Sequence, residues 1–295
     1  MTRELVLVHG RAQQDKDADE LKAQWLTALR AGLAKSGLEL PIPESDVRFP
    51  YYGDTLRDLV EDVPADQAAA IRIRGEGMDA AQRDFTRAIV EEIKAAEGLT
   101  REQLIAVSNR QVVARGPVQW PWVQAVLEAL DRFVPGASAV SIALFTHDVY
   151  HYLRHPGVRD RIDTGVRKAI TPGVPAVVVG HSLGSVVAYN ILRRDGAALG
   201  WEVPLYVSVG SPLGISEIRR ALRPVGRPAC VERWFNAMDD RDVVALFPLD
   251  GTHFPITPPI ENWTGVRNST SNRHGIAGYL DDAQVARRVH DALLG

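Results

Sequence analysis

The sequence predicts an α/β protein whose mostly parallel central sheet is covered by helices on both faces. Short apolar runs recur along the chain, and segments with helical apolar spacing separate most of them. Loops that contain Gly, His or Asp follow several of these runs. Because the carboxyl ends of parallel strands meet at one edge of a sheet, we expect the functional residues in these loops.

The expected strands are runs in which Val and other apolar residues dominate. They cover residues 5–8, 47–52, 175–179, 204–209 and 231–236. The second run is the weakest, because Pro50 cannot donate a backbone hydrogen bond to a neighbouring strand.

Helical spacing of apolar residues predicts the elements that cover the sheet. These helices cover residues 17–35, 138–153, 158–170, 185–192 and 281–294. In the first of them, Leu21, Trp25 and Leu29 share one face, and Gly37 follows as a stop signal.

Residues 54–135 interrupt the alternation of strands and helices. This stretch is rich in Ala, Arg, Glu and Asp, and it contains at least two further helical patterns, one of them at Phe85, Ile89 and Ile93. We therefore expect a core formed by residues 1–53 and 136–295, and a helical cap formed by the insertion 54–135.

Composition narrows the class of protein. The 295 residues, 45% of them hydrophobic, suffice for one large domain or two small ones. A net charge of −3 gives no electrostatic reason to expect nucleic acid or an anionic membrane as a partner. The single cysteine cannot form an internal disulfide. Neither a signal-peptide core nor a run of ~20 apolar residues is present, so we expect a cytoplasmic protein without an integral membrane segment.

The stretch Gly180-His181-Ser182-Leu183-Gly184 is the most informative motif. It lies between a predicted strand and a predicted helix, which is the setting of a nucleophile elbow with an exposed serine hydroxyl. The two glycines are needed because a side chain at either position would collide with a neighbouring strand or helix. Ser182 is therefore the candidate nucleophile, and His181 is expected to point away from it and to have a structural role.

A serine nucleophile needs a base, usually a histidine that a carboxylate orients. After an elbow of this kind the acid comes before the histidine in the chain. Asp242 is the favoured acid because an apolar run follows it, with Asp239 as the alternative and Asp240 as a third carboxylate in the same loop. His274 lies in a polar loop before the last helix and is the favoured base, with His253 as the alternative.

Backbone N–H groups must also stabilise the oxyanion of a tetrahedral intermediate. Leu183, directly after the serine, would supply one, and the loop after the first strand would supply the other. In that loop Gly10 permits close approach, and Arg11 is the expected donor.

A metal-dependent reaction is the alternative chemistry. His147, His151 and His155 are four residues apart and would share a helix face. Pro156 ends that helix at the third histidine, and no His-Glu-x-x-His motif is present. We expect a polar helix face here, and neither a metal nor another cofactor.

Taken together, these motifs resemble the α/β-hydrolase superfamily, specifically its lipase- and esterase-like members. The residues that carry the resemblance are Val8-His9-Gly10, the elbow around Ser182, Gly210-Ser211-Pro212-Leu213, Asp242 with Val244-Ala245, and His274. It covers roughly residues 3–53 and 138–295 and implies a Ser-His-Asp triad that works through an acyl-enzyme.

The resemblance implies a carboxylic ester hydrolase with a small-molecule or lipid acyl substrate. An acyltransferase, thioesterase or amidase with the same triad stays open, as does a non-catalytic binding protein of this fold. Trp120, Trp122 and Phe133 in the expected cap are candidates for lining an acyl pocket, although their helical spacing also suits ordinary helix packing. The sequence leaves the oligomeric state open.

Overall fold

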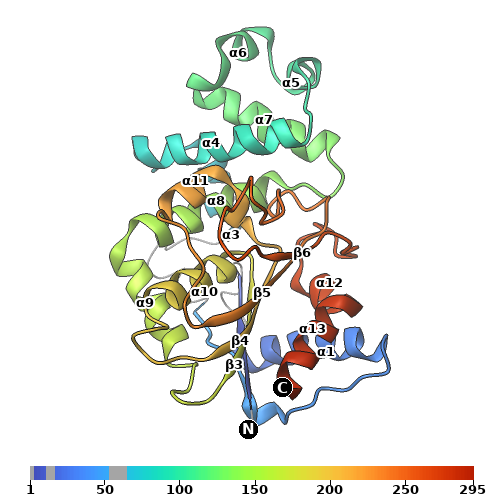
Figure 1. Cartoon of the computed structure of the whole chain (residues 1–295). Helices are drawn as coiled ribbons and strands as arrows, with labels where there is room; N and C mark the ends of the chain where they lie inside the picture. The colour runs from blue at the N-terminus through green and yellow to red at the C-terminus, as the bar shows by residue number, and fades with distance from the viewer. Residues whose placement is uncertain (1–2, 11–16, 53–64) are drawn as a thin grey trace.

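The computed structural model describes residues 3–10, 17–52 and 65–295 (Figure 1). In this part of the chain six strands form one sheet in which every neighbouring pair is parallel, in the order β2-β1-β3-β4-β5-β6. The strands are β1 (Glu4–Val8), β2 (Val47–Arg48), β3 (Ala176–His181), β4 (Val203–Val209), β5 (Val231–Ala237) and β6 (Glu261–Trp263). The predicted α/β class with a parallel sheet is confirmed.

Helices cover both faces of the sheet (Figure 1). They are α1 (Ala18–Ala34), α3 (Ala65–Arg74), α4 (Ala80–Ala96), α5 (Arg101–Val107), α6 (Arg110–Arg115), α7 (Trp120–Phe133), α8 (Ala139–Arg154), α9 (Pro156–Arg167), α10 (Leu183–Arg194), α11 (Ser216–Ala221), α12 (Ile276–Leu280) and α13 (Ala283–Leu294). Asp17 caps α1 by accepting hydrogen bonds from the N–H groups of Asp19 and Glu20.

Successive residues of each central strand point to opposite faces, so the sheet separates two apolar cores. Leu5 and Leu7 of β1 pack with α1, α12 and α13 on one face. Val6 and Val8 belong to the core on the other face, which includes residues of α8, α9 and α10. Both faces are buried, which explains why the strands read as continuous apolar runs.

Helices α3 to α7 form within the predicted insertion. Figure 1 shows α4, α5, α6 and α7 beyond the end of the sheet toward which the strands run. Phe85, Ile89 and Ile93 of α4 are buried, and they belong to the same apolar cluster as Val6 and Val8. These helices therefore continue the core on one face of the sheet.

Two edge strands differ from the sequence-based expectation. The predicted strand at 47–52 is reduced to Val47–Arg48 and ends before Pro50, as the missing N–H of proline requires. The strand β6 was not predicted, because its three residues are too few to show an apolar pattern and are partly exposed.

The strand order places a topological switch point between β1 and β3. From β1 the chain continues to β2 on one side, and later to β3 on the other side. Loops that follow two such strands diverge and leave a crevice at their carboxyl ends, where ligands bind in open α/β sheets. Ser182 follows β3 directly, and Gly10 lies in the loop after β1.

Candidate active site

Ser182 occupies the tight turn that the motif predicts. Its φ of 53° lies in the left-handed region, which a side-chain-bearing residue adopts only where the surroundings hold it. A Cβ at Gly180 would lie 2.7 Å from the Ser185 Cα, and one at Gly184 would lie 2.2 Å from the Val8 carbonyl oxygen. Only glycine fits at both positions, so β3, the turn and α10 pack closely and raise the serine at the strand end.

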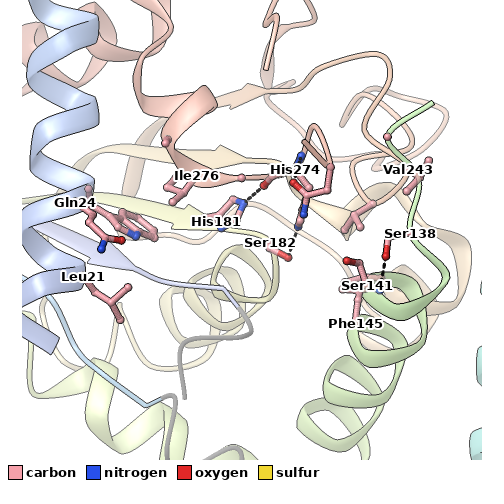
Figure 2. Close-up of a pocket in the computed structure, with 16 residues that line it drawn as sticks. Leu21, Gln24, Ser138, Ser141, Phe145, His181, Ser182, Val243, His274 and Ile276 are labelled. Carbon is pink, nitrogen blue, oxygen red and sulfur yellow. Dashed lines mark hydrogen bonds between the residues drawn. The ribbon is translucent and has the colours of Figure 1, made fainter. Parts of the chain in front are cut away.

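His274 contacts the Ser182 hydroxyl (Figure 2). Its Nε2 lies 2.8 Å from the Ser182 Oγ, and its Nδ1 lies 2.7 Å from the Asp242 Oδ2. The carboxylate accepts the Nδ1–H, which leaves Nε2 without a proton and able to accept one from the hydroxyl. The His274 side chain is 16% exposed, so water can reach the imidazole.

The structure separates the three carboxylates of the acid loop. Asp242 is buried and contacts His274, and its other oxygen accepts the Val244 N–H at 2.9 Å. The apolar run that follows it, residues 243–245, is buried, and the backbone of this run donates to the carboxylate.

Asp239 and Asp240 have other partners. Asp239 accepts hydrogen bonds from Arg241 at 2.9 and 2.7 Å and from the Asn268 N–H at 2.7 Å. Burial alone would raise the pKa of Asp239, but these hydrogen bonds outweigh it and lower the pKa to about 2. Asp240 is exposed and pairs with Arg267. Neither carboxylate orients the imidazole of His274.

The alternative base, His253, lies in a different environment. Its Nδ1 is 3.0 Å from Asp250, and its ring stacks on Phe247 with the centroids 4.3 Å apart. His253 is not among the described residues that line the cavity around Ser182.

Leu183 and Gly10 both lie beside Ser182. Leu183 is the first residue of α10, where the helix supplies no acceptor for the N–H. A Cβ at Gly10 would lie 2.9 Å from the Ser182 Cβ, so the backbone at Gly10 lies too close to the serine for a side chain to fit. Arg11, the expected second donor, lies outside the described residues.

His9 fixes the peptide that follows it. Burial lowers its pKa to about 4, so the ring is neutral near pH 7. Its Nε2 accepts the Tyr52 N–H at 3.0 Å, and its Nδ1 therefore donates to the Gly10 carbonyl at 2.7 Å. These two hydrogen bonds fix the orientation of the His9 ring and of the Gly10 carbonyl.

Two further residues support the Ser182–His274 pair, and neither was assigned to the site from sequence. His181 Nε2 donates to the His274 carbonyl at 2.8 Å, so it contacts the loop of the base (Figure 2). Tyr279 donates its hydroxyl hydrogen to Asp242 at 2.6 Å. A tyrosine five residues after a candidate base, near the end of the short helix α12, carries no motif that could have revealed this contact.

A cavity of about 330 Å³ surrounds the Ser182–His274 pair. Its volume is at the lower end of the usual range for small-molecule sites. Apolar side chains supply much of the wall, and the described lining residues include no Lys, Arg, Asp or Glu: Leu21, Gln24, Trp25, Gly136, Ser138, Ser141, Phe145, His181, Ser182, Val243, Val244, Asn272, His274, Gly275, Ile276 and Ala277.

Trp120, Trp122 and Phe133 are not among those lining residues. Trp122 is buried within the helical layer, and Phe133 packs against the same cluster. The Trp120 indole N–H donates to the Ile73 carbonyl at 2.8 Å, and its ring covers Gly75. The structure thus does not bring these aromatic residues to Ser182, because their helical spacing serves contacts between helices.

His147 and His151 of α8 and His155 at its C-terminal cap lie side by side, as their spacing predicts. Ring centroids are 4.3 Å apart for His147 and His151, and 4.5 Å apart for His151 and His155. His147 Nδ1 lies 2.6 Å from the Gln82 amide. Within residues 3–10, 17–52 and 65–295, no group of three or more His, Cys, Asp or Glu side chains is arranged to hold a metal.

Comparisons of this chain with protein-family models, curated proteins and solved structures give no match. Among the described helices, none combines the length and the apolar character needed to cross a membrane. The geometry around Ser182 is therefore the observation from which a function is inferred.

Proposed function

We propose that this chain is a serine hydrolase of the α/β-hydrolase type, similar to lipases and esterases, and that it cleaves carboxylic esters. The observation that carries the proposal is the hydrogen-bonded series Ser182–His274–Asp242, with distances of 2.8 and 2.7 Å. This arrangement activates a serine because the imidazole can take the hydroxyl proton while the carboxylate orients the imidazole.

In the proposed reaction, Ser182 Oγ attacks the carbonyl carbon of the ester while His274 Nε2 takes the hydroxyl proton. The Leu183 N–H and the loop after β1 stabilise the oxyanion. The intermediate collapses, the bond between the acyl carbon and the alcohol oxygen breaks, and His274 gives its proton to the departing alcohol. An acyl group remains on Ser182.

Water completes the cycle by the same route. His274 takes a proton from water, the resulting oxygen nucleophile attacks the acyl carbon, and the bond to Ser182 Oγ breaks as the serine regains its proton. One ester and one water become one acid and one alcohol. Asp242 stays ionised and stabilises the imidazolium that forms in each half of the cycle.

A fluorophosphonate probe tests the nucleophile, because it reacts covalently with activated serines. We expect one adduct, located by peptide mass spectrometry on Ser182, and no adduct in Ser182→Ala. The control is Ser185→Ala, which removes another buried hydroxyl, from the first turn of α10, and should leave labelling intact. An adduct elsewhere, or undiminished labelling of Ser182→Ala, would overturn the proposal.

Hydrolysis of para-nitrophenyl butanoate tests the base. His274→Ala should lower kcat by about 10²- to 10⁴-fold, the usual contribution of a positioned general base. His253→Ala should leave kcat nearly unchanged, since His253 contacts Asp250 and Phe247 rather than Ser182. The opposite ranking of the two variants would exclude His274 as the base.

A further inference from the structure

The cavity extends to both sides of the Ser182–His274 pair (Figure 2). On one side lies the α8 arm, whose wall includes Ser138, Ser141, Phe145 and Val243. On the other side lies the α1 arm, whose wall includes Leu21, Gln24 and Ile276. An ester also has two groups on either side of its carbonyl carbon, the acyl chain and the alcohol.

The two arms differ in their access to solvent. Each arm has a buried apolar wall, to which Phe145 and Val243 contribute in the α8 arm and Leu21 in the α1 arm. The arms differ at their rims, where Ser138 and Ser141 of the α8 arm are half-buried and Gln24 of the α1 arm is exposed. The α8 arm is thus the more closed of the two at its rim.

The order of the two chemical steps assigns a group to each arm. In ester hydrolysis through an acyl-enzyme the alcohol leaves first, while the acyl group stays bonded to Ser182 until water arrives. A closed arm suits the group that stays for both steps, and an open arm suits the group that departs and is replaced by water. Binding energy from the retained group can then act in both transition states.

The chemistry of the α8 arm limits which acyl group fits. Its buried wall is aliphatic and aromatic, and the described residues around the cavity include no charged Lys, Arg, Asp or Glu side chain. The Ser138 Oγ already accepts the Ser141 N–H as the cap of α8. A carboxylate or phosphate placed there would lose its hydration without gaining a charged partner among these lining residues, which is strongly unfavourable.

We propose that the α8 arm binds the acyl group and the α1 arm binds the departing alcohol, so that the substrates are esters of uncharged, apolar acids. This inference rests on the proposed ester hydrolysis. In it, Phe145 and Ser141 are the residues that determine which acyl groups fit. Phe145 forms part of the inner wall, and Ser141 stands one helical turn away at the half-buried rim.

Two esters with the same leaving group test the charge preference. Para-nitrophenyl pentanoate and para-nitrophenyl hemisuccinate are similar in length, but the second carries a carboxylate at the end of its acyl chain. We expect kcat/KM for the pentanoate to exceed that for the hemisuccinate by at least about 100-fold. Equal values would overturn the assignment of an uncharged acyl group.

Two variants test which arm holds the acyl chain. Phe145→Leu enlarges the α8 arm and should raise the ratio of kcat/KM for octanoyl over butanoyl esters by about tenfold or more. Ser141→Leu narrows the arm from its rim and should lower the same ratio. Because Ser141 is half-buried, this second variant should fold even if the core does not tolerate Phe145→Leu.

The matched control acts on the α1 arm. Gln24→Phe adds bulk at an exposed position of the α1 arm. It should change the order of kcat/KM among methyl, butyl and benzyl esters of one acid, and leave the order of kcat/KM among esters of different acids unchanged. If Phe145→Leu and Ser141→Leu change the alcohol ranking instead, the arms are reversed and the inference fails while ester hydrolysis stands. If no ester is hydrolysed in a Ser182-dependent manner, the proposed function fails and this inference fails with it.

Discussion

Tyr279 and His274 bind the same oxygen of Asp242. The Tyr279 hydroxyl lies 2.6 Å from Oδ2, and the His274 Nδ1 lies 2.7 Å from it. Burial, together with the neighbouring Asp242 charge, raises the pKa of Tyr279 well above its ordinary value, so the hydroxyl keeps its proton. The carboxylate therefore has two permanent donors on one oxygen and the Val244 N–H on the other.

Removing the tyrosine hydroxyl should destabilise the protein. Tyr279→Phe removes a buried hydrogen bond to a charged group, and such bonds contribute about 1.5–3 kcal/mol. Urea unfolding followed by circular dichroism measures the loss. Tyr150→Phe is the control, since the Tyr150 hydroxyl is 3.4 Å from Asp79 and should contribute less. Equal losses for both variants would contradict the importance of the contact between Tyr279 and Asp242.

The carboxylates of the acid loop should separate into a catalytic and a structural role. Asp242→Asn replaces the acceptor of the His274 Nδ1–H and should lower kcat on the order of 10⁴-fold, with little change in fluorescence or circular dichroism. Asp239→Asn should instead lower the free energy of unfolding, because Arg241 and the Asn268 N–H lose a charged acceptor. Steady-state kinetics and urea unfolding of both variants test this separation, which a large kcat loss in Asp239→Asn would contradict.

The close approach of α10 to β1 should make Gly184 intolerant of any side chain. The Cβ of Gly184→Ala would lie 2.2 and 2.3 Å from the Val8 and His9 carbonyl oxygens, so backbone has to shift. We expect a loss of about 1–3 kcal/mol in unfolding free energy, the typical result of overpacking. Gly165→Ala in α9 is the control, because its Cβ meets nothing within 4 Å. It should leave stability unchanged or raise it by up to ~1 kcal/mol.

Acid should destabilise the protein through its buried neutral histidines. Burial lowers the pKa of His9 to about 4, and burial together with the neighbouring His274 lowers that of His181 to about 3. In the unfolded chain these two histidines take up protons near pH 6.5, whereas in the folded protein they stay neutral there. Below about pH 6.5 the unfolded chain therefore binds more protons than the folded protein, and the free energy of unfolding falls as the pH drops from about 6.5 to about 4.

His181→Gln isolates one of these groups. Glutamine keeps an N–H that can reach the His274 carbonyl, but it does not titrate. The slope of unfolding free energy against pH between about pH 6 and 4.5 should decrease by up to ~1.4 kcal/mol per pH unit, the value for one proton. Urea unfolding across this range measures the slope, and an unchanged slope would show that His181 is protonated in the folded state.

Much of the fold was predictable because it depends on local patterns. Parallel strands buried on both faces read as apolar runs, so β1, β3 and β4 were found close to their observed bounds. The elbow was predictable because Gly180 and Gly184 satisfy a steric requirement within the turn itself. Short edge elements such as β6 carry no comparable signal, since three partly exposed residues have no apolar pattern.

The aromatic residues of the insertion show where local pattern is insufficient. The apolar spacing that places Trp122 and Phe133 on a helix is the same whether the face meets a ligand or another helix. The structure packs both residues within the helical layer. Phe145, Val243 and Val244 form the buried wall beside Ser182 instead, and they come from segments read only as a helix and a loop anchor.

By itself the sequence determined the order of the central strands and the helices between them, the turn that presents Ser182, and short loops that hold the candidate acid and base. Only the tertiary structure decided which carboxylate meets His274. Asp239, Asp240 and Asp242 have the same chemistry and lie within four consecutive positions. Asp239 accepts hydrogen bonds from its neighbour Arg241 and from the distant Asn268 N–H, whereas Asp242 contacts His274 and Tyr279. The contacts with Asn268, His274 and Tyr279 join segments far apart in the chain, so no local pattern could encode them.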